Sequence, residues 1–198
     1  MNEITLRGTI HNIEFSHKIK NTDFYKAIVE VENPNGGESN FITVKYKQSY
    51  CNYGEGDAVA LKGNIRSYSY KENDKNKVNV YVFTYFDEPE SNATNEFKVD
   101  GRVCKINPLY TTKAGNYSLQ FILANNLYDE SRGLKFNSYL PVVCWGEEAL
   151  RLSNELKIND IVEVTGSFHT RHYTKTINDE DVVFEVQELL ADTVKGEK

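Results

Sequence analysis

Residues 62–81 gather the side chains that would recognise single-stranded nucleic acid. An unpaired base offers a flat π-face that stacks on a tyrosine ring, while lysine and arginine neutralise phosphates. The stretch has a local net charge of +3, because only Glu72 and Asp74 oppose its five basic residues. Tyrosine is also an ordinary exposed strand residue, and hairpin tips are usually charged, so a second observation is needed. The relevant side chains are Tyr68, Tyr70 and Tyr81 with Lys62, Arg66, Lys71, Lys75 and Lys77.

That second observation is an internal repeat. The segment NEITLRGTIHNI at residue 2 returns as NEFKVDGRVCKI at residue 95, and GDAVALKGNIRSYSYK (56–71) returns as NDIVEVTGSFHTRHYT (159–174). Between the copies, the polar stretch DEPESNATNE contains a proline and no apolar periodicity, which is typical of a linker. We therefore expect two domains, residues 1–90 and 96–198, joined by a linker at 91–95.

Each half reads as five strands separated by turns. A glycine in the first strand of each copy lets the strand coil at a barrel corner. In the second half, GEEALRLSNELK places Ala149, Leu150, Leu152 and Leu156 on one helical face, between the third and fourth strands. Five strands with a helix after the third is the arrangement of an OB-fold. The expected fold is therefore all-β, with two tandem five-stranded OB-fold barrels, the second with a short helix between its strands 3 and 4. The expected strands are 3–14, 24–32, 40–47, 57–70 and 78–86, then 96–106, 117–125, 137–145, 160–173 and 181–188.

The alternation of apolar residues sorts the candidate side chains by face. In the strand 57–70 the apolar residues, such as Val59 and Leu61, occupy odd positions, so Arg66, Tyr68 and Tyr70 should point outward. In the strand 160–173 the apolar residues occupy even positions. The outward set found from that alternation alone falls at the same places of the repeat: His169, Arg171 and Tyr173.

The third strand of each half extends this pattern. Ile42 and Val44 alternate inward, which leaves Phe41, Lys45 and Lys47 outward. Alignment of the second half places two further aromatic residues outward, Tyr139 and Trp145. Exposed aromatic rings gain free energy when something covers them, and the cover would be a base, a partner subunit or a loop of the same chain.

Composition narrows the function classes. The net charge of −6 argues against a nonspecific polycation but leaves nucleic acid open, because a ligand meets the local field. The three cysteines share no metal spacing, and we expect reduced thiols in the cytoplasm. We expect no signal peptide, because the sequence opens on a strand-like segment, and no apolar run approaches the roughly 18 residues of a membrane span. His169 and His172 would face opposite sides of a strand, and no phosphate loop or catalytic triad occurs. We expect no metal, no cofactor, no membrane association and no enzymatic activity.

The residues 139–174, YLPVVCWGEEALRLSNELKINDIVEVTGSFHTRHYT, resemble the bacterial single-stranded-DNA-binding protein family. That family has an aromatic strand ending in V-V-x-[WF]-G, a helix, the strand K-G-D-x-V-x-V-x-G and then R-x-R-x-[WY]. The segment TTKAGNYSLQFILANN (111–126) is similar to its second strand. The second half carries the resemblance closely, and the first half shares it only through the internal repeat.

The resemblance implies roles for individual residues. Tyr139, Trp145 and Tyr173 fall where the family places base-stacking aromatic residues, and Tyr128 falls near another. Arg171 occupies a position that the family keeps basic. His169 stands where the family usually has its first arginine, so that phosphate contact does not carry over, and Asn159 replaces the glycine of K-G-D.

The family also implies an assembly. Its usual member has one OB domain and forms a tetramer, whereas a subgroup with two domains forms a dimer, so we expect a homodimer with four OB domains. The family's acidic, phenylalanine-tipped tail is not matched by LLADTVKGEK, and we do not expect tail-mediated partner recruitment. The missing first-half helix fits a divergent version, such as one encoded by a phage or mobile element.

The leading hypothesis is a protein that binds single-stranded DNA with little sequence preference and protects it in replication, recombination or repair. The alternatives are an OB-fold protein-interaction module, such as a replication-initiation accessory protein, and the binding subunit of a nucleic-acid enzyme. The candidate interface residues are Phe41, Lys45, Lys47, Arg66, Tyr68, Tyr70, Lys71, Lys75, Lys77, Tyr81, Tyr128, Tyr139, Trp145, His169, Arg171, Tyr173 and Lys175.

Overall fold

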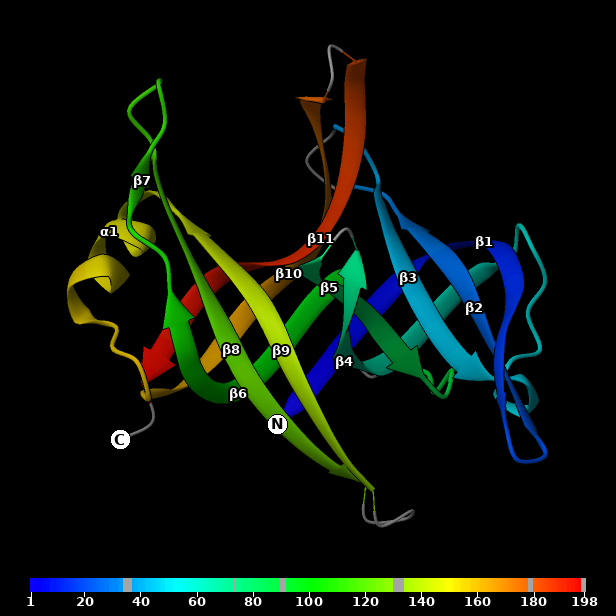
Figure 1. Ribbon diagram of the computed structural model, residues 1–198. Coiled ribbons are helices and arrows are strands. Elements are labelled where there is room, and N and C mark those ends of the chain that lie inside the picture. Colours follow the sequence, from blue (N-terminus) through cyan, green and yellow to red (C-terminus); the bar gives the residue numbers. More distant parts are fainter. Residues whose placement is uncertain (34–36, 73, 90–91, 130–133, 178–179, 197–198) are drawn as a thin grey trace.

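The first half of the chain forms a closed barrel. The computed structural model describes residues 1–33, 37–72, 74–89, 92–129, 134–177 and 180–196. The barrel closes in the order β1-β2-β3-β5-β4-β1 (Figure 1). Its strands are β1 (Asn2–Ile19), β2 (Thr22–Val31), β3 (Asn40–Lys47), β4 (Ala58–Glu72) and β5 (Lys75–Thr84).

The second half repeats the same connectivity. Its barrel closes in the order β6-β8-β9-β11-β10-β6, with β9 and β11 parallel as β3 and β5 are in the first barrel. The two-residue β7 (Tyr110–Thr111) pairs with the first residues of β8, Tyr117 and Ser118. The predicted all-β fold with two OB barrels is confirmed. The strands are β6 (Asn95–Ile106), β8 (Tyr117–Asp129), β9 (Leu134–Trp145), β10 (Ile161–Ile177) and β11 (Glu180–Gly196).

Several strands are longer than the sequence pattern predicts. β1 continues to Ile19, and β10 and β11 project beyond their barrel as a long hairpin (Figure 1). The predicted last strand, 181–188, covers only the projecting part of β11, and the barrel is lined by Leu189, Ala191 and Val194. Apolar alternation fails as a guide in projecting hairpins because neither face of the strand is buried in the barrel.

Glycine allows the strands of each barrel to approach closely. A Cβ atom on Gly8 would lie 2.0 Å from the carbonyl oxygen of Glu30, and one on Gly101 would lie 2.6 Å from that of Ala124. The two glycines hold the same place in the repeat, on the strand that pairs with neighbours on both of its edges. Any side chain there would force the backbones apart at the barrel corner.

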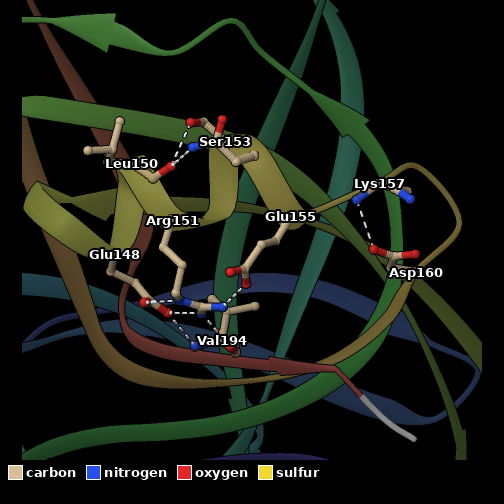
Figure 2. A network of polar contacts seen from close by, with 9 residues as sticks. Glu148, Leu150, Arg151, Ser153, Glu155, Lys157, Asp160 and Val194 are labelled. Atoms are coloured by element: carbon tan, nitrogen blue, oxygen red, sulfur yellow. Dashed lines mark hydrogen bonds and ion pairs between the residues drawn. The ribbon is translucent and has the colours of Figure 1, made fainter.

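The helix α1 (Gly146–Glu155) lies between β9 and β10, where the sequence predicts it. Ala149 and Leu152 are buried against the barrel. Figure 2 shows how Glu148 and Arg151 tie the helix to β11: Val194 donates its backbone N–H to Glu148 Oε1 (3.1 Å) and accepts from Arg151 Nη2 (3.0 Å). The hydrogen bond from Arg151 lowers the pKa of the Glu148 carboxyl. The helix therefore closes one end of the second barrel.

The first barrel has only the 3₁₀ turn η1 (Gln48–Tyr50) at the equivalent point. Phe86, just after β5, packs there instead. Its ring lies edge-on to buried Tyr46, with centroids 5.0 Å apart, and 5.5 Å from the ring of Tyr53. Its backbone N–H donates to Thr84 Oγ1 (2.8 Å). An aromatic plug thus takes the place of the helix, and burial raises the pKa of Tyr46.

The two barrels join through an antiparallel pairing of β1 with β6. The register runs from Asn2 opposite Val99 to Leu6 opposite Asn95, so the strands of both barrels form one continuous sheet. Asn2 and Asn95, which are equivalent in the repeat, each bond with both backbone groups of one residue in their own barrel, Ile65 and Phe168, at 2.7–2.9 Å. The division at 91–95 stays a prediction, and Asn95 is already the first residue of β6.

A second set of contacts crosses between the barrels near the hairpins. On one side, Tyr139 donates its backbone N–H to Ser67 Oγ (2.8 Å), and Ser67 donates its own to Ser138 Oγ (3.3 Å). On the other side, Thr170 donates its backbone N–H to Asn40 Oδ1 (3.0 Å) and its hydroxyl to the carbonyl of Phe41 (2.8 Å). Each barrel's fourth strand thus docks on the third strand of the other barrel.

Candidate nucleic-acid interface

An aromatic cluster with a lysine over it lies on the outside of the first barrel. Tyr68 is 44% exposed and Tyr70 is 39% exposed. The ring of Tyr68 lies 6.0 Å from the rings of Tyr70 and of half-buried Tyr81. Lys45 Nζ lies 4.5 Å from the ring centroid of Tyr68 and 4.4 Å from that of Tyr81. The structure therefore brings together four of the predicted residues, from β3, β4 and β5.

The electrostatics of this cluster favour an anion. Burial lowers the pKa of Lys45, and the nearby positive charge of Lys26 lowers it further. A phosphate placed beside Lys45 would offset both effects, because an opposite charge favours the protonated amine. A hollow of about 300 Å³ runs past Lys26, Lys45 and Tyr68, with Glu14 on its rim ion-paired to Lys26 at 2.9 Å.

A groove of about 390 Å³ lies between the barrels. It holds Tyr70 and Tyr173, which are equivalent in the repeat, together with Lys77, so three predicted residues share one cavity. Thr43 and Asn79 line both this inter-domain groove and the hollow beside Lys45, so the two lie next to each other. The first-barrel wall comprises Thr43, Tyr70, Lys77, Val78, Asn79 and Val80, and the second-barrel wall comprises Pro141, Tyr173, Glu185, Val186 and Gln187.

The outer face of the β8–β9 hairpin carries the remaining predicted aromatic residues. Tyr128, Tyr139 and Trp145 are all exposed. Pro141 lies on the same face of β9, between Tyr139 and Trp145, and connects this row to the inter-domain groove. The row and the groove form one surface across the two barrels.

Two residues of this surface were not found from the sequence. Tyr110 is 62% exposed and pairs with Ser118, which also pairs with Trp145, so the two rings flank one small residue on neighbouring strands. The sequence signal was present as an aromatic residue at the start of a short hairpin. The sequence shows Pro141 only as part of an apolar strand, because a proline beside a groove has no sequence pattern of its own.

Three predicted residues lie at the edges of the surface. Phe41 is exposed, and its carbonyl accepts hydrogen bonds from the second barrel. Lys47 Nζ lies 5.3 Å from the ring centroid of Tyr50, and Lys71 is exposed on the outer part of β4. The side chains of Lys75 and Lys175 lie outside the described part of the structure.

Arg66 points out of its own barrel as expected, but its side chain is not accessible there. Its side chain is only 5% exposed, and its guanidinium lies 4.1 Å from the ring centroid of Phe83 and 4.0 Å from that of Phe136 on the second barrel. Alternation correctly places Arg66 outside its own barrel, but the other barrel covers it there. Arg66 therefore contacts rings of both domains and is buried between them.

The equivalent residue in the second half is also partly enclosed. His169 is half-buried, and its Nε2 lies 3.0 Å from Ser167 Oγ. Burial lowers the pKa of His169 below its ordinary value of 6.5, so the ring is neutral at pH 7. Burial thus disfavours the charged form of His169, whereas Tyr173 and Arg171 in the same row are exposed as predicted.

Arg171 is exposed but engaged. Its Nε and Nη2 atoms lie 3.2 and 3.5 Å from the carboxylate oxygens of Glu188, which is only 7% exposed. Its guanidinium also lies 5.6 Å from the ring centroid of Tyr173. The arginine therefore already has an anionic partner beside the groove.

Other kinds of site find little support in the described residues. Among them, no three His, Cys, Asp or Glu side chains gather in a way that would hold a metal ion. Cys51, Cys104 and Cys144 are free thiols. Within the described ranges, no helix has the length and apolar character that crossing a membrane requires.

Comparison with known proteins identifies the family. The model of the single-strand binding protein family matches residues 94–195, which is more than half of the chain. The chain belongs to the single-strand binding protein family. The resemblance seen in residues 139–174 is thereby confirmed.

The fold of the whole chain, including the first half, is similar to solved structures. The wild-type single-stranded DNA binding protein from Thermus aquaticus matches with a TM-score of 0.72 and 17% sequence identity, over 100% of this chain and 93% of that chain. A deletion mutant of the same protein matches with a TM-score of 0.73 and 17% identity, over 100% and 95% of the two chains. No curated protein sequence matches the chain.

Proposed function

We propose that this member of the single-strand binding protein family binds single-stranded DNA with little sequence preference. The observation that carries the proposal is the inter-domain groove, where Tyr70 and Tyr173, found from the separate alternation of each half, line one cavity with Lys77. Family membership supports single-stranded DNA as the ligand. Every base has a π-face, so stacking on tyrosine tolerates any sequence.

We propose a path for the strand across both barrels. It runs from Tyr110 and Trp145 along the β8–β9 face, past Tyr139 and Pro141, through the groove and onto the cluster around Lys45. Each part of this path is an exposed aromatic residue or one of the two neighbouring hollows. We place Arg66 off the path because it is buried, His169 because it is half-buried, and Arg171 because Glu188 already engages it.

The role that follows is protection rather than chemistry. The residues of this path would act by stacking and by charge, so we propose a non-catalytic protein that shelters exposed strands in the cytoplasm during replication, recombination or repair. A protein-interaction module would use the same exposed aromatic rings, but its binding to DNA would be absent.

We also propose that two chains associate, giving four OB domains. The outer face of the continuous sheet carries charges of both signs, among them Glu3, Lys98 and Glu163. Lys98 and Glu163 already pair with each other at 2.9 Å, so the assembly is proposed from the resemblance to family members with two domains, which form dimers. Light scattering at micromolar concentration should give the mass of a dimer, and a monomer mass would refute the assembly.

A titration tests the binding function. We expect oligo(dT) to quench the fluorescence of Trp145, since this indole is exposed on the proposed path. The affinity should fall as salt rises, because bound lysines release counterions from the phosphates. Absence of binding at low salt near neutral pH would refute the function, and salt-independent binding would refute the phosphate contacts.

A further inference from the structure

The hairpins that project beside the inter-domain groove carry opposite charges. The first-domain arm, residues 66–81 of β4 and β5, has four basic residues against Glu72 and Asp74, a net charge of +2. The second-domain arm, residues 169–188 of β10 and β11, has five acidic residues against Arg171 and Lys175, a net charge of −3. The two arms therefore carry aromatic residues at equivalent positions, but their net charges have opposite signs.

Among the described side chains of the second-domain arm, Arg171 and His172 each pair with one of its acidic residues. Arg171 makes two contacts with Glu188, and His172 Nε2 lies 3.4 Å from Glu185. A carboxylate as buried as Glu188 is costly to leave without a partner. If Arg171 bound a phosphate, Glu188 would lose its cationic partner while still buried. We therefore expect Arg171 to stay paired with Glu188.

The walls of the inter-domain groove differ in the same way. The first-barrel wall contributes Lys77, and the adjoining hollow contributes Lys45. The second-barrel wall contributes Glu185 beside Tyr173 and Val186. A polyanion in this groove would be attracted to one side and repelled from the other, whereas both sides offer an aromatic ring.

We propose that the bound strand is oriented across the groove, with its phosphates along the first barrel and its bases turned toward the second-barrel wall. Glu185 excludes the backbone from that wall, and Glu188 is a positioning residue that keeps Arg171 from the phosphates. The proposal rests on the proposed binding of single-stranded DNA. Its consequence is that the two domains contribute unequally: the first supplies phosphate contacts and stacking, the second stacking alone.

The salt dependence of oligo(dT) binding shows which lysine and arginine side chains contact phosphates. Each contact with a single strand contributes a slope of about 0.7 in the plot of log K against log salt concentration. We expect Lys45→Gln and Lys77→Gln each to reduce the slope by about that amount. Arg171→Gln should leave it unchanged. Because that change leaves Glu188 buried alone, the pair Arg171→Gln/Glu188→Gln, whose amides can bond to each other, provides a second variant expected to fold.

The acidic wall is tested in the opposite direction. We expect Glu185→Gln to tighten oligo(dT) binding at low salt by about fivefold, the equivalent of one charge–charge contact at 4 Å in water. Glu88→Gln makes the same change in net charge at an exposed residue beyond the other end of β5, and should leave the affinity unchanged.

The outcomes separate this inference from the binding function. If the wild-type chain binds oligo(dT) and both Arg171 variants lose about 0.7 of slope, the orientation is overturned while single-stranded DNA binding stands. The same holds if Glu185→Gln binds no tighter than Glu88→Gln. If the wild-type chain fails to bind, the function itself fails, and the orientation with it.

Discussion

Tyr70 and Tyr173 provide the sharpest test of the shared groove. Each ring is about two-fifths exposed, and both line the same cavity of about 390 Å³. That volume is near the lower limit of pockets that hold a drug-sized ligand, so we expect the two rings to stack on the same base or on adjacent ones. Truncation of either ring to alanine should cost about 1–3 kcal/mol of binding free energy.

The double variant then reports on coupling between the rings. If both contact one base, or two bases stacked together, removing the first ring also loosens the base against the second. We expect the loss in Tyr70→Ala/Tyr173→Ala to differ from the sum of the single losses by at least about 0.5 kcal/mol, as for residues that share a partner. Two separate sites would give losses that add.

The assay is fluorescence anisotropy of a labelled oligo(dT) at one fixed salt concentration, for the wild-type chain and the three variants. Tyr70→Phe and Tyr173→Phe serve as matched controls, because they keep the ring and remove only the hydroxyl. Thermal unfolding of each variant checks that the barrels are intact. Unchanged affinity in a folded double alanine variant would remove both rings from the interface, and strict additivity would refute the shared-base argument.

Four further predictions concern the stability of the barrels and of the contact between them. Arg66→Ala should lower the free energy of unfolding by about 2–4 kcal/mol in urea, because it removes contacts with two rings, and should leave the salt slope of DNA binding unchanged; a reduced slope would return Arg66 to the interface. Phe86→Ala should cost about 2–3 kcal/mol by opening the end of the first barrel, and full stability in this variant would show that the plug is dispensable. Gly8→Ala should cost about 1–3 kcal/mol because its Cβ would overlap the Glu30 carbonyl, whereas Gly196→Ala, with open space around it, is the control and should be near neutral. Burial lowers the pKa of His169, so as the pH falls through 6.5 the unfolded chain binds more protons than the folded one, and the free energy of unfolding should fall. His169→Gln should therefore lose less stability than the wild-type chain between pH 7 and 5. An equal loss in both would show that other groups dominate.

Local patterns were sufficient for the fold. Alternation within each half placed the strands, except for the barrel part of β11, the 3.6-residue period of 146–157 gave the helix, and the repeat gave a second barrel. The same alternation found the exposed rings of Tyr68, Tyr70 and Tyr173. These features depend on contacts within one barrel, where residues close in sequence determine the inner and outer faces.

The relation between the barrels could not be predicted in that way. Alternation separates the inside of a barrel from the outside, but it does not say what covers the outside, so Arg66 was assigned to solvent when Phe136 lies over it. The acids of the second-domain arm are plain in the sequence, yet only the structure shows that Glu188 holds Arg171. The lining of the inter-domain groove comes from residues far apart in the sequence, from Thr43 to Gln187, and no local pattern indicates that they meet.

The pairing of β1 with β6 has an evolutionary consequence. In an assembly of identical chains, every substitution appears in all copies, so the surfaces related by symmetry must change together. Here one polypeptide supplies both of the strands that pair where the barrels join, β1 and β6. Each half therefore mutates under its own constraints, and one barrel has a helix at its base while the other has an aromatic plug. Covalent linkage preserves the joint while it frees the halves to specialise.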